Sequence, residues 1–222
     1  FDLFHKSYFN NYKKFHPTSI KSGNYLEKLS LNKANKVIYS SKYAQINAVQ
    51  KYNIKMNKTK VIPFGSDILP INKKKFLFAQ KNRIRNNKKI IKLISIGVDW
   101  NRKNMSKSVE VTKELNNMGV KCCLTIVGAT PPKNFLIPKF IKIIPFISKN
   151  KKKNVLKLKK IYLSSDYFIL LSKAEAFGLV IQEATSYGLP LILNNIDGMK
   201  YVADKKYTIF VDKKSSPYEI AT

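Results

Sequence analysis

Two glutamates stand on either side of a glycine in the stretch KAEAFGLVIQEATSYGLP, residues 173–190. Gly178 is expected to open a helix, whose first backbone N–H groups would bind an anion with the help of the helix dipole. An ionised carboxylate accepts two or more hydrogen bonds from sugar hydroxyls. Glu175 and Glu183 could therefore hold two sugar rings on either side of a pyrophosphate. Alternatively, acidic residues simply favour a helix N-terminus and Glu183 is solvated, and the spacing alone leaves both readings open.

The elements that would position these carboxylates form a regular alternation of apolar runs and amphipathic segments. Helices are predicted at 105–119 and 153–165, with stripes Val111, Leu115, Met118 and Val155, Leu158, Tyr162. The runs predicted as buried strands are 90–98, 120–128, 140–147, 166–172, 189–195 and 207–212. Strands so uniformly apolar are typical of a parallel sheet with helices on both faces. We therefore predict an α/β fold with a doubly wound, Rossmann-like sheet over about 90–212. Glu175 follows strand 166–172 and would lie at the carboxyl edge, where such sheets bind ligands.

The chain before this sheet contains fewer regular elements. A short strand is predicted at 36–41, followed by a helix that begins at Ser40 or Ser41 as its N-cap. A second strand is predicted within 60–68, ending at Pro63 and Gly65. Residues 69–89 are rich in lysine and weakly periodic, which favours an interdomain linker.

The net charge of +29 favours an anionic partner such as nucleic acid, anionic lipid or a phosphorylated substrate. Of the 42 basic residues, however, only Arg83, Arg85 and Arg102 are arginines. A surface that reads bases would use the bidentate arginine side chain more often. The charge is therefore interpreted as lysines spread over solvated faces, with a weak attraction to anionic membranes and no specific nucleic acid partner.

Neither the cysteines nor the histidines have the spacing of metal ligands. Cys122 and Cys123 are neighbours in an apolar run, so their side chains would point to opposite faces of a strand, as core residues in a reducing compartment. His5 and His16 lie far from any cluster of cysteines or carboxylates. No apolar run approaches the roughly 20 residues of a membrane helix, and no signal peptide is recognisable. We expect a cytoplasmic protein without a metal site, with possible peripheral contact at the inner face of the membrane.

Several motifs, in the same order along the chain, resemble one enzyme family. The stretch EAFGLVIQEATSYGLPLIL is similar to the Glu-x7-Glu signature of retaining group 1 (family 4) glycosyltransferases, which have the GT-B fold. The supporting segments are SIGVDWNRKN (95–104), LTIVG (124–128), IYLSSDYFILLSKAE (161–175) and KVIPFGSDI (60–68). The resemblance covers about 35–220. It implies that 1–68 is the end of an acceptor-binding domain, 69–89 a linker and 90–222 the domain that binds a nucleotide-sugar donor.

The resemblance also assigns roles to individual residues. Glu175 matches the glutamate that faces the transferred sugar and is the implied catalytic residue, and Glu183 matches the one that holds the nucleotide ribose. The backbone amides offered to the sugar and phosphate are those of Phe177, Gly178 and Leu179.

A basic pair for the donor diphosphate is implied at the loop after strand 90–98. Lys103 matches the family's lysine. Arg102 would supply the charge of an arginine that usually follows the strand glycine, where this chain has Val98. Asn104 replaces a common glycine. The loop at 145–148 would lie beside the nucleobase.

The implied reaction moves a hexosyl unit from a nucleotide-diphosphate sugar, the co-substrate, to a saccharide or lipid-linked acceptor with retention at the anomeric carbon, without a cofactor. Since only the last piece of an acceptor-binding domain would be present, we expect an incomplete chain, at its start and at its end, that does not transfer sugar alone. Two alternatives stay open. The chain could be a basic nucleic-acid-binding module, or a non-catalytic remnant of a glycosyltransferase.

Overall fold

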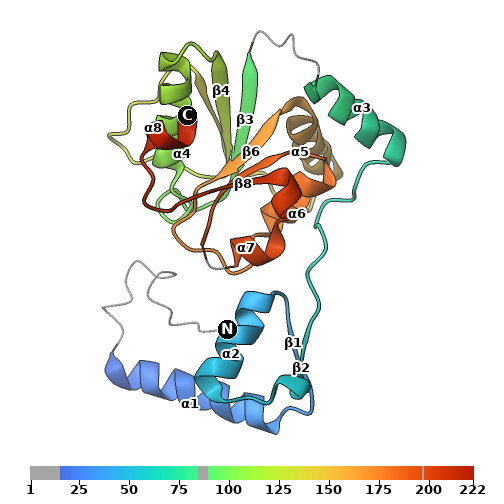
Figure 1. Cartoon of the computed structure of the whole chain (residues 1–222), viewed down its shortest axis with the longest axis vertical. Coiled ribbons are helices and arrows are strands. Elements are labelled where there is room, and N and C mark those ends of the chain that lie inside the picture. Colours follow the sequence, from blue (N-terminus) through green and yellow to red (C-terminus); the bar gives the residue numbers. More distant parts are fainter. Residues whose placement is uncertain (1–15, 85–89, 197) are drawn as a thin grey trace.

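The computed structural model of the chain describes residues 16–84, 90–196 and 198–222. Figure 1 shows a smaller N-terminal part, drawn in blue, joined by one extended segment to a larger part built on a sheet. The elements of the smaller part are α1 (Pro17–Lys33), β1 (Val37–Tyr39), α2 (Lys42–Tyr52), a 3-10 turn η2 (Met56–Lys58) and β2 (Thr59–Val61). β1 and β2 pair in parallel, and a core of its own lies between this pair and the helices.

The larger part follows the extended segment and contains six strands with helices between them. Its strands are β3 (Ile91–Ile96), β4 (Cys122–Val127), β5 (Ile141–Ile144), β6 (Tyr167–Leu170), β7 (Leu191–Asn194) and β8 (Thr208–Val211). Its helices are α3 (Lys73–Ile84), α4 (Met105–Asn117), α5 (Lys152–Ser164), α6 (Leu179–Ser186), α7 (Met199–Val202) and α8 (Pro217–Ala221), with a 3-10 turn η3 (Lys205–Tyr207). All pairings are parallel, in the order β5-β4-β3-β6-β7-β8.

Helices cover both faces of this sheet, as the apolar strands predict. Along β6, Phe168 and Leu170 pack into the core that lies beneath α5 and α6, whereas Ile169 packs into the core beneath α4. The three side chains have no exposed surface. Because consecutive strand residues alternate between the faces, a strand covered on both sides must be apolar throughout. The predicted doubly wound α/β sheet is confirmed.

The predicted helices are also present, with small differences at their ends. Ser41 is the N-cap of α2, since its side chain accepts a hydrogen bond from the backbone N–H of Ala44 at 3.2 Å. On α5, Leu158 and Tyr162 are buried as predicted. On α4, by contrast, Met118 is 38% exposed, because the helix ends at Asn117 and Met118 is its C-cap.

Other elements differ from the sequence-based expectations. The strand predicted within 60–68 is only the end of β2, which stops at Val61, two residues before Pro63, whose missing N–H cannot extend the ladder. The strands of the sheet are one to three residues shorter at each end than the apolar runs. Helix α1 was not predicted, because it buries only Leu31 and has little amphipathic character.

Twelve residues of the stretch predicted as a linker form α3. Its Arg83 donates hydrogen bonds to backbone carbonyls at the ends of α5 and α6, those of Tyr162, Ser165, Tyr187 and Gly188, at 2.8–3.3 Å. Burial lowers the pKa of Arg83, an effect opposed by the nearby Asp166. These bonds fasten α3 to the sheet domain. The division into 1–68, 69–89 and 90–222 stays a prediction. Residues 85–89 with Arg85, like His5 near the start, lie outside the described residues.

Candidate functional site

A cleft of about 710 Å³ opens at the carboxyl edge of the sheet, beside the start of α6. All seven residues predicted for the site line it: Arg102, Lys103, Glu175, Phe177, Gly178, Leu179 and Glu183. They lie in the loops that follow β3 and β6, which are neighbours in the sheet, and in the helix α6 after the second loop. Parallel neighbours end at the same edge, so segments more than 70 residues apart in sequence meet here.

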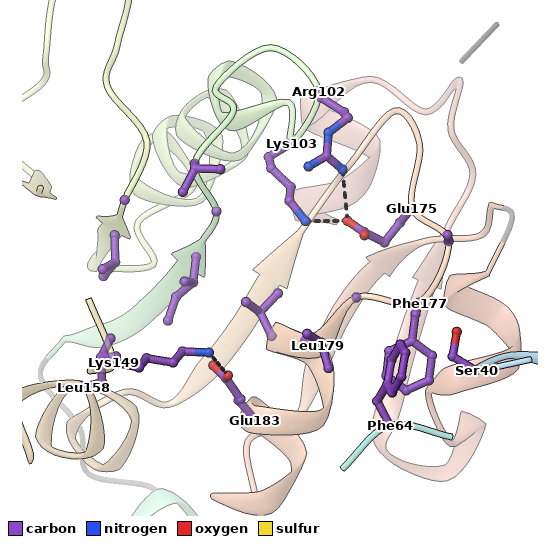
Figure 2. A pocket seen from close by; sticks show the side chains of 18 of the residues that line it. Ser40, Phe64, Arg102, Lys103, Lys149, Leu158, Glu175, Phe177, Leu179 and Glu183 are labelled. Carbon is purple, nitrogen blue, oxygen red and sulfur yellow. Dashed lines mark hydrogen bonds and ion pairs between the residues drawn. The ribbon is translucent and has the colours of Figure 1, made fainter. Parts of the chain in front are cut away.

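At one end of the cleft, Glu175 is paired with two cations (Figure 2). The ammonium of Lys103 donates a hydrogen bond to its carboxylate, and Nη1 of Arg102 lies 3.5 Å from the same oxygen. Glu175 and Lys103 are each 6% exposed. Two positive groups therefore share the carboxylate of Glu175, and Nε of Arg102 also lies 3.8 Å from a carboxylate oxygen of Asp99.

Backbone contacts hold the loops of this pair in register. The carbonyl of Arg102 accepts a hydrogen bond from the N–H of Lys173 at 2.8 Å, and Asp99 accepts one from the N–H of Arg102 at 2.9 Å. Asn104, where a glycine was expected from the resemblance, has a left-handed backbone with φ of 54°. Asparagine tolerates this conformation better than most residues, so the turn before α4 is kept.

In the middle of the cleft, the helix α6 begins with a glycine. Gly178 is its N-cap, with φ of 74°, and no side chain caps the helix. Within the described residues, the backbone N–H groups of Phe177, Gly178 and Leu179 donate no hydrogen bond. These donors, together with the helix dipole, make this point suited to an anion.

The other end of the cleft contains Glu183, which is only 1% exposed and not solvated. One carboxylate oxygen accepts a hydrogen bond from the ammonium of Lys149, and the other accepts one from the hydroxyl of Tyr162 at 2.8 Å. Burial and the charge of Glu183 raise the pKa of Tyr162 well above its ordinary value. Burial alone would lower the pKa of Lys149, but the hydrogen bonds and charges of Glu183 and Asp67 raise it. Both partners therefore stay protonated and keep donating to the carboxylate.

The sequence analysis did not identify Lys149 or Tyr162 as site residues. Tyr162 lies on the predicted apolar stripe of its helix, so it was interpreted as a core residue only. Lys149 directly follows the loop 145–148 that was assigned to the nucleobase, and that adjacency was the one available signal. Within this loop Phe146 and Ile147 line the cleft.

The smaller part of the chain closes the cleft on the opposite side. Ile38, Tyr39, Ser40 and Ala44 line it there. Phe64, from the extended segment, lies edge-on against the ring of Phe177, with centroids 5.3 Å apart (Figure 2). This wall is mostly apolar, whereas the wall formed by the sheet domain carries the charged groups.

Other predicted features are found away from the cleft. Cys122 is buried and Cys123 half-buried, both as free thiols. His16 is the N-cap of α1 and accepts a hydrogen bond from Thr18. Within 16–84, 90–196 and 198–222, no cluster of three or more His, Cys, Asp or Glu could hold a metal ion. In the same ranges no helix has the length and apolar character needed to cross a membrane.

Solved structures with the same fold include several glycosyltransferases. WaaG, a glycosyltransferase involved in lipopolysaccharide biosynthesis, aligns with a TM-score of 0.61 and 19% identity over 84% of this chain and 51% of WaaG. HepE of Anabaena, in complex with UDP-glucose, aligns with a TM-score of 0.64 and 18% identity over 99% of this chain and 58% of HepE. A glycosyltransferase from Rickettsia africae aligns with a TM-score of 0.60 and 18% identity over 96% of this chain and 55% of its own. The chain thus spans about half the length of these proteins, and its fold matches theirs.

A search of curated proteins found no match to the chain. The family model described as glycosyl transferases group 1 matches residues 74–222. That range includes both glutamates, the helix start between them and the Arg102–Lys103 pair. It is well over half of the sequence, and the chain therefore belongs to the group 1 glycosyl transferase family.

Proposed function

We propose that the chain carries the donor site of a retaining glycosyltransferase that moves a hexosyl unit from a nucleotide-diphosphate sugar to a saccharide or lipid-linked acceptor. The observation that carries the proposal is the order of groups along one cleft. Glu175 with its two cations, the uncapped start of α6, and Glu183 follow one another. This order matches the order of sugar, diphosphate and ribose in such a donor.

The diphosphate would bind between the two glutamates. The N–H groups at Gly178 and the cations of Arg102 and Lys103, which line the cleft, would neutralise its oxygens. When the bond between the anomeric carbon and the phosphate breaks, negative charge grows on the leaving diphosphate. Positive groups that are already fixed in place stabilise that charge without reorganising, which lowers the barrier.

Glu175 would accept hydrogen bonds from hydroxyls of the transferred sugar and thereby orient it. Because its carboxylate is bound to Lys103 and Arg102, we propose positioning rather than covalent attack as its role. Glu183 would accept hydrogen bonds from the ribose hydroxyls. Retention at the anomeric carbon, the hexosyl unit and the acceptor rest on the family resemblance.

Two structural neighbours support a nucleotide sugar as the ligand. HepE was solved with UDP-glucose, and the pneumococcal O-GlcNAc transferase GtfA with UDP and GlcNAc. Their identities to this chain are 18% each, so they support the class of donor and not its base or sugar. The proposal therefore covers nucleoside diphosphates in general.

Titration calorimetry of the chain with UDP and with GDP tests the proposal. Heat of binding is expected for at least one nucleotide, and Glu183→Gln should weaken it by about tenfold or more, the value of a charge-assisted hydrogen bond. Glu110→Gln, on the exposed side of α4, is the matched control and should change nothing. No heat at millimolar nucleotide from a folded chain refutes the donor site and favours the non-catalytic remnant.

A parallel titration with RNA addresses the nucleic-acid alternative. Binding to phosphates through scattered lysines would be weak and would fall steeply with salt. Salt-sensitive RNA binding, without any preference for nucleotide sugars, would favour that alternative.

A further inference from the structure

We propose that Lys149 is a positioning residue for Glu183, and that Asp67, outside the cleft, sets the affinity for the nucleotide through Lys149. The inference rests on the proposed function, because it takes the ribose of a nucleotide as the ligand of Glu183. It adds two residues that do not belong to the Glu-x7-Glu motif.

Lys149 lies between two carboxylates from different parts of the chain. Its ammonium donates to Glu183 in α6 and lies 3.2 Å from a carboxylate oxygen of Asp67 in the extended segment. Lys149 and Glu183 both line the cleft, and Figure 2 shows their side chains pointing toward each other. Asp67 does not line it, and its side chain is 51% exposed. The ion pair with Lys149 therefore connects Asp67 to the cleft.

Glu183 needs such a partner because it is almost completely buried. A buried carboxylate is costly unless it is paired with a cation and hydrogen-bonded. Lys149 supplies the charge and Tyr162 a second hydrogen bond, one to each oxygen. A carboxylate offers about four lone-pair sites, so about two remain for a pair of ribose hydroxyls. Without Lys149, the carboxylate would take up a proton or turn away, and would be a poorer acceptor.

Asp67 is held firmly enough to act as an anchor. The next residue, Ile68, has no exposed surface and belongs to the core beneath α5 and α6. The carbonyl of Leu69 accepts a hydrogen bond from the hydroxyl of Tyr187 in the α6–β7 turn at 3.2 Å. The segment around Asp67 is therefore fixed to the sheet domain, and a change at Asp67 acts on the position of the Lys149 ammonium rather than only on the local chain.

The opposite role for Lys149 makes an opposite prediction. If Lys149 merely occupied Glu183 until a nucleotide displaced it, removing Lys149 would tighten binding. A positioning role predicts weaker binding. The sign of the change thus separates the two.

The experiment measures binding of UDP, of GDP and of their 2′,3′-dideoxy analogues by calorimetry. The variants are Lys149→Met, Lys149→Arg and Asp67→Asn, with Lys153→Met, an exposed lysine nearby, as the control for loss of one positive charge. Lys149→Met should weaken the binding of UDP or GDP by about tenfold or more. Lys149→Arg should restore binding to within about threefold, and Asp67→Asn should weaken it by about threefold, as for a half-exposed ion pair. Lys153→Met should have no effect.

The dideoxy analogues separate positioning from general damage. They lack the hydroxyls from which Glu183 would accept hydrogen bonds, so the Lys149→Met variant should bind them as well as the unchanged chain does. Equal losses for both kinds of nucleotide would make Lys149 merely structural, and tighter or unchanged binding of UDP and GDP would refute the proposal while leaving the proposed function intact. If Lys149→Met does not fold, the proposal is tested by the binding of UDP and GDP to Asp67→Asn and Lys149→Arg, with the losses stated above as the expected result. Absence of any nucleotide binding by the unchanged chain refutes the proposed function, and this inference with it.

Discussion

Glu175→Gln removes one negative charge from beside two cations and hardly changes the volume of the side chain. Lys103 is 6% exposed and loses its counter-ion, although glutamine can still accept a hydrogen bond from it. Breaking a fully buried pair costs about 3–5 kcal/mol. Because Arg102 is partly solvated and a hydrogen bond remains, we expect a loss of about 2–3 kcal/mol in the free energy of unfolding. For a chain of this size, the melting temperature should fall by about 5–10 °C.

The same change should separate the affinities for nucleotide and for sugar nucleotide. In the variant, Lys103 has lost its carboxylate partner and Arg102 keeps Asp99, so a diphosphate should bind at least as tightly as before. The transferred sugar loses its charged acceptor, so a UDP-sugar should bind about tenfold more weakly or worse. The ratio of the two affinities is therefore more informative than either alone.

Calorimetry with UDP and UDP-glucose, and thermal unfolding with and without UDP, measure these effects. GDP and GDP-mannose replace them if the chain prefers guanosine. Glu110→Gln is again the control, because it removes a carboxylate from an exposed position on α4. If the binding of UDP and of UDP-glucose were weakened equally, the assignment of Glu175 to the sugar would be contradicted. An unchanged melting temperature would contradict the stabilising role of its pairs with Lys103 and Arg102.

Three further predictions concern the framework of the site. In Gly198→Ala the new Cβ would lie 1.9 Å from the carbonyl oxygen of Ala176, so the loop that carries Glu175 must shift. The midpoint of urea unfolding should fall by an amount equivalent to about 1–3 kcal/mol. An unchanged midpoint would show that the loop can move at no cost in stability. Arg83→Ala removes the hydrogen bonds between α3 and the ends of α5 and α6. The free energy of unfolding in urea should fall by about 3 kcal/mol, while the affinity for nucleotide stays the same. A loss of nucleotide affinity would instead place Arg83 in the site. Burial raises the pKa of Cys122 from 9.0 to about 11, so the stability it contributes is complete below pH 9 and is lost as the pH rises toward 11. Between pH 8 and 11, the midpoint of urea unfolding should fall less steeply with pH for Cys122→Ala than for the unchanged chain. Parallel curves would show that ionisation of Cys122 does not cause the loss of stability.

The sheet and its main helices could be predicted from the sequence, because burial on both faces imposes a local pattern. Apolar runs such as 166–172 and the stripe through Leu158 and Tyr162 hold this information within a few residues. The start of α6 was predictable for the same reason, since the left-handed backbone at Gly178 favours glycine. Where burial is slight the pattern fails, and α1, which buries a single leucine, was missed.

The sequence by itself also determined that two carboxylates flank a helix start, and which loop carries the Arg102–Lys103 pair. It did not determine which cation each glutamate meets. Lys149 lies 34 residues before Glu183, and Asp67 lies a further 82 residues before Lys149. In a chain with so many lysines, no local pattern distinguishes the one whose ammonium reaches a buried carboxylate. Only the tertiary structure decides it, because an ion pair depends on distance in space, and that distance is set by loops of separate strands ending at one edge of the sheet.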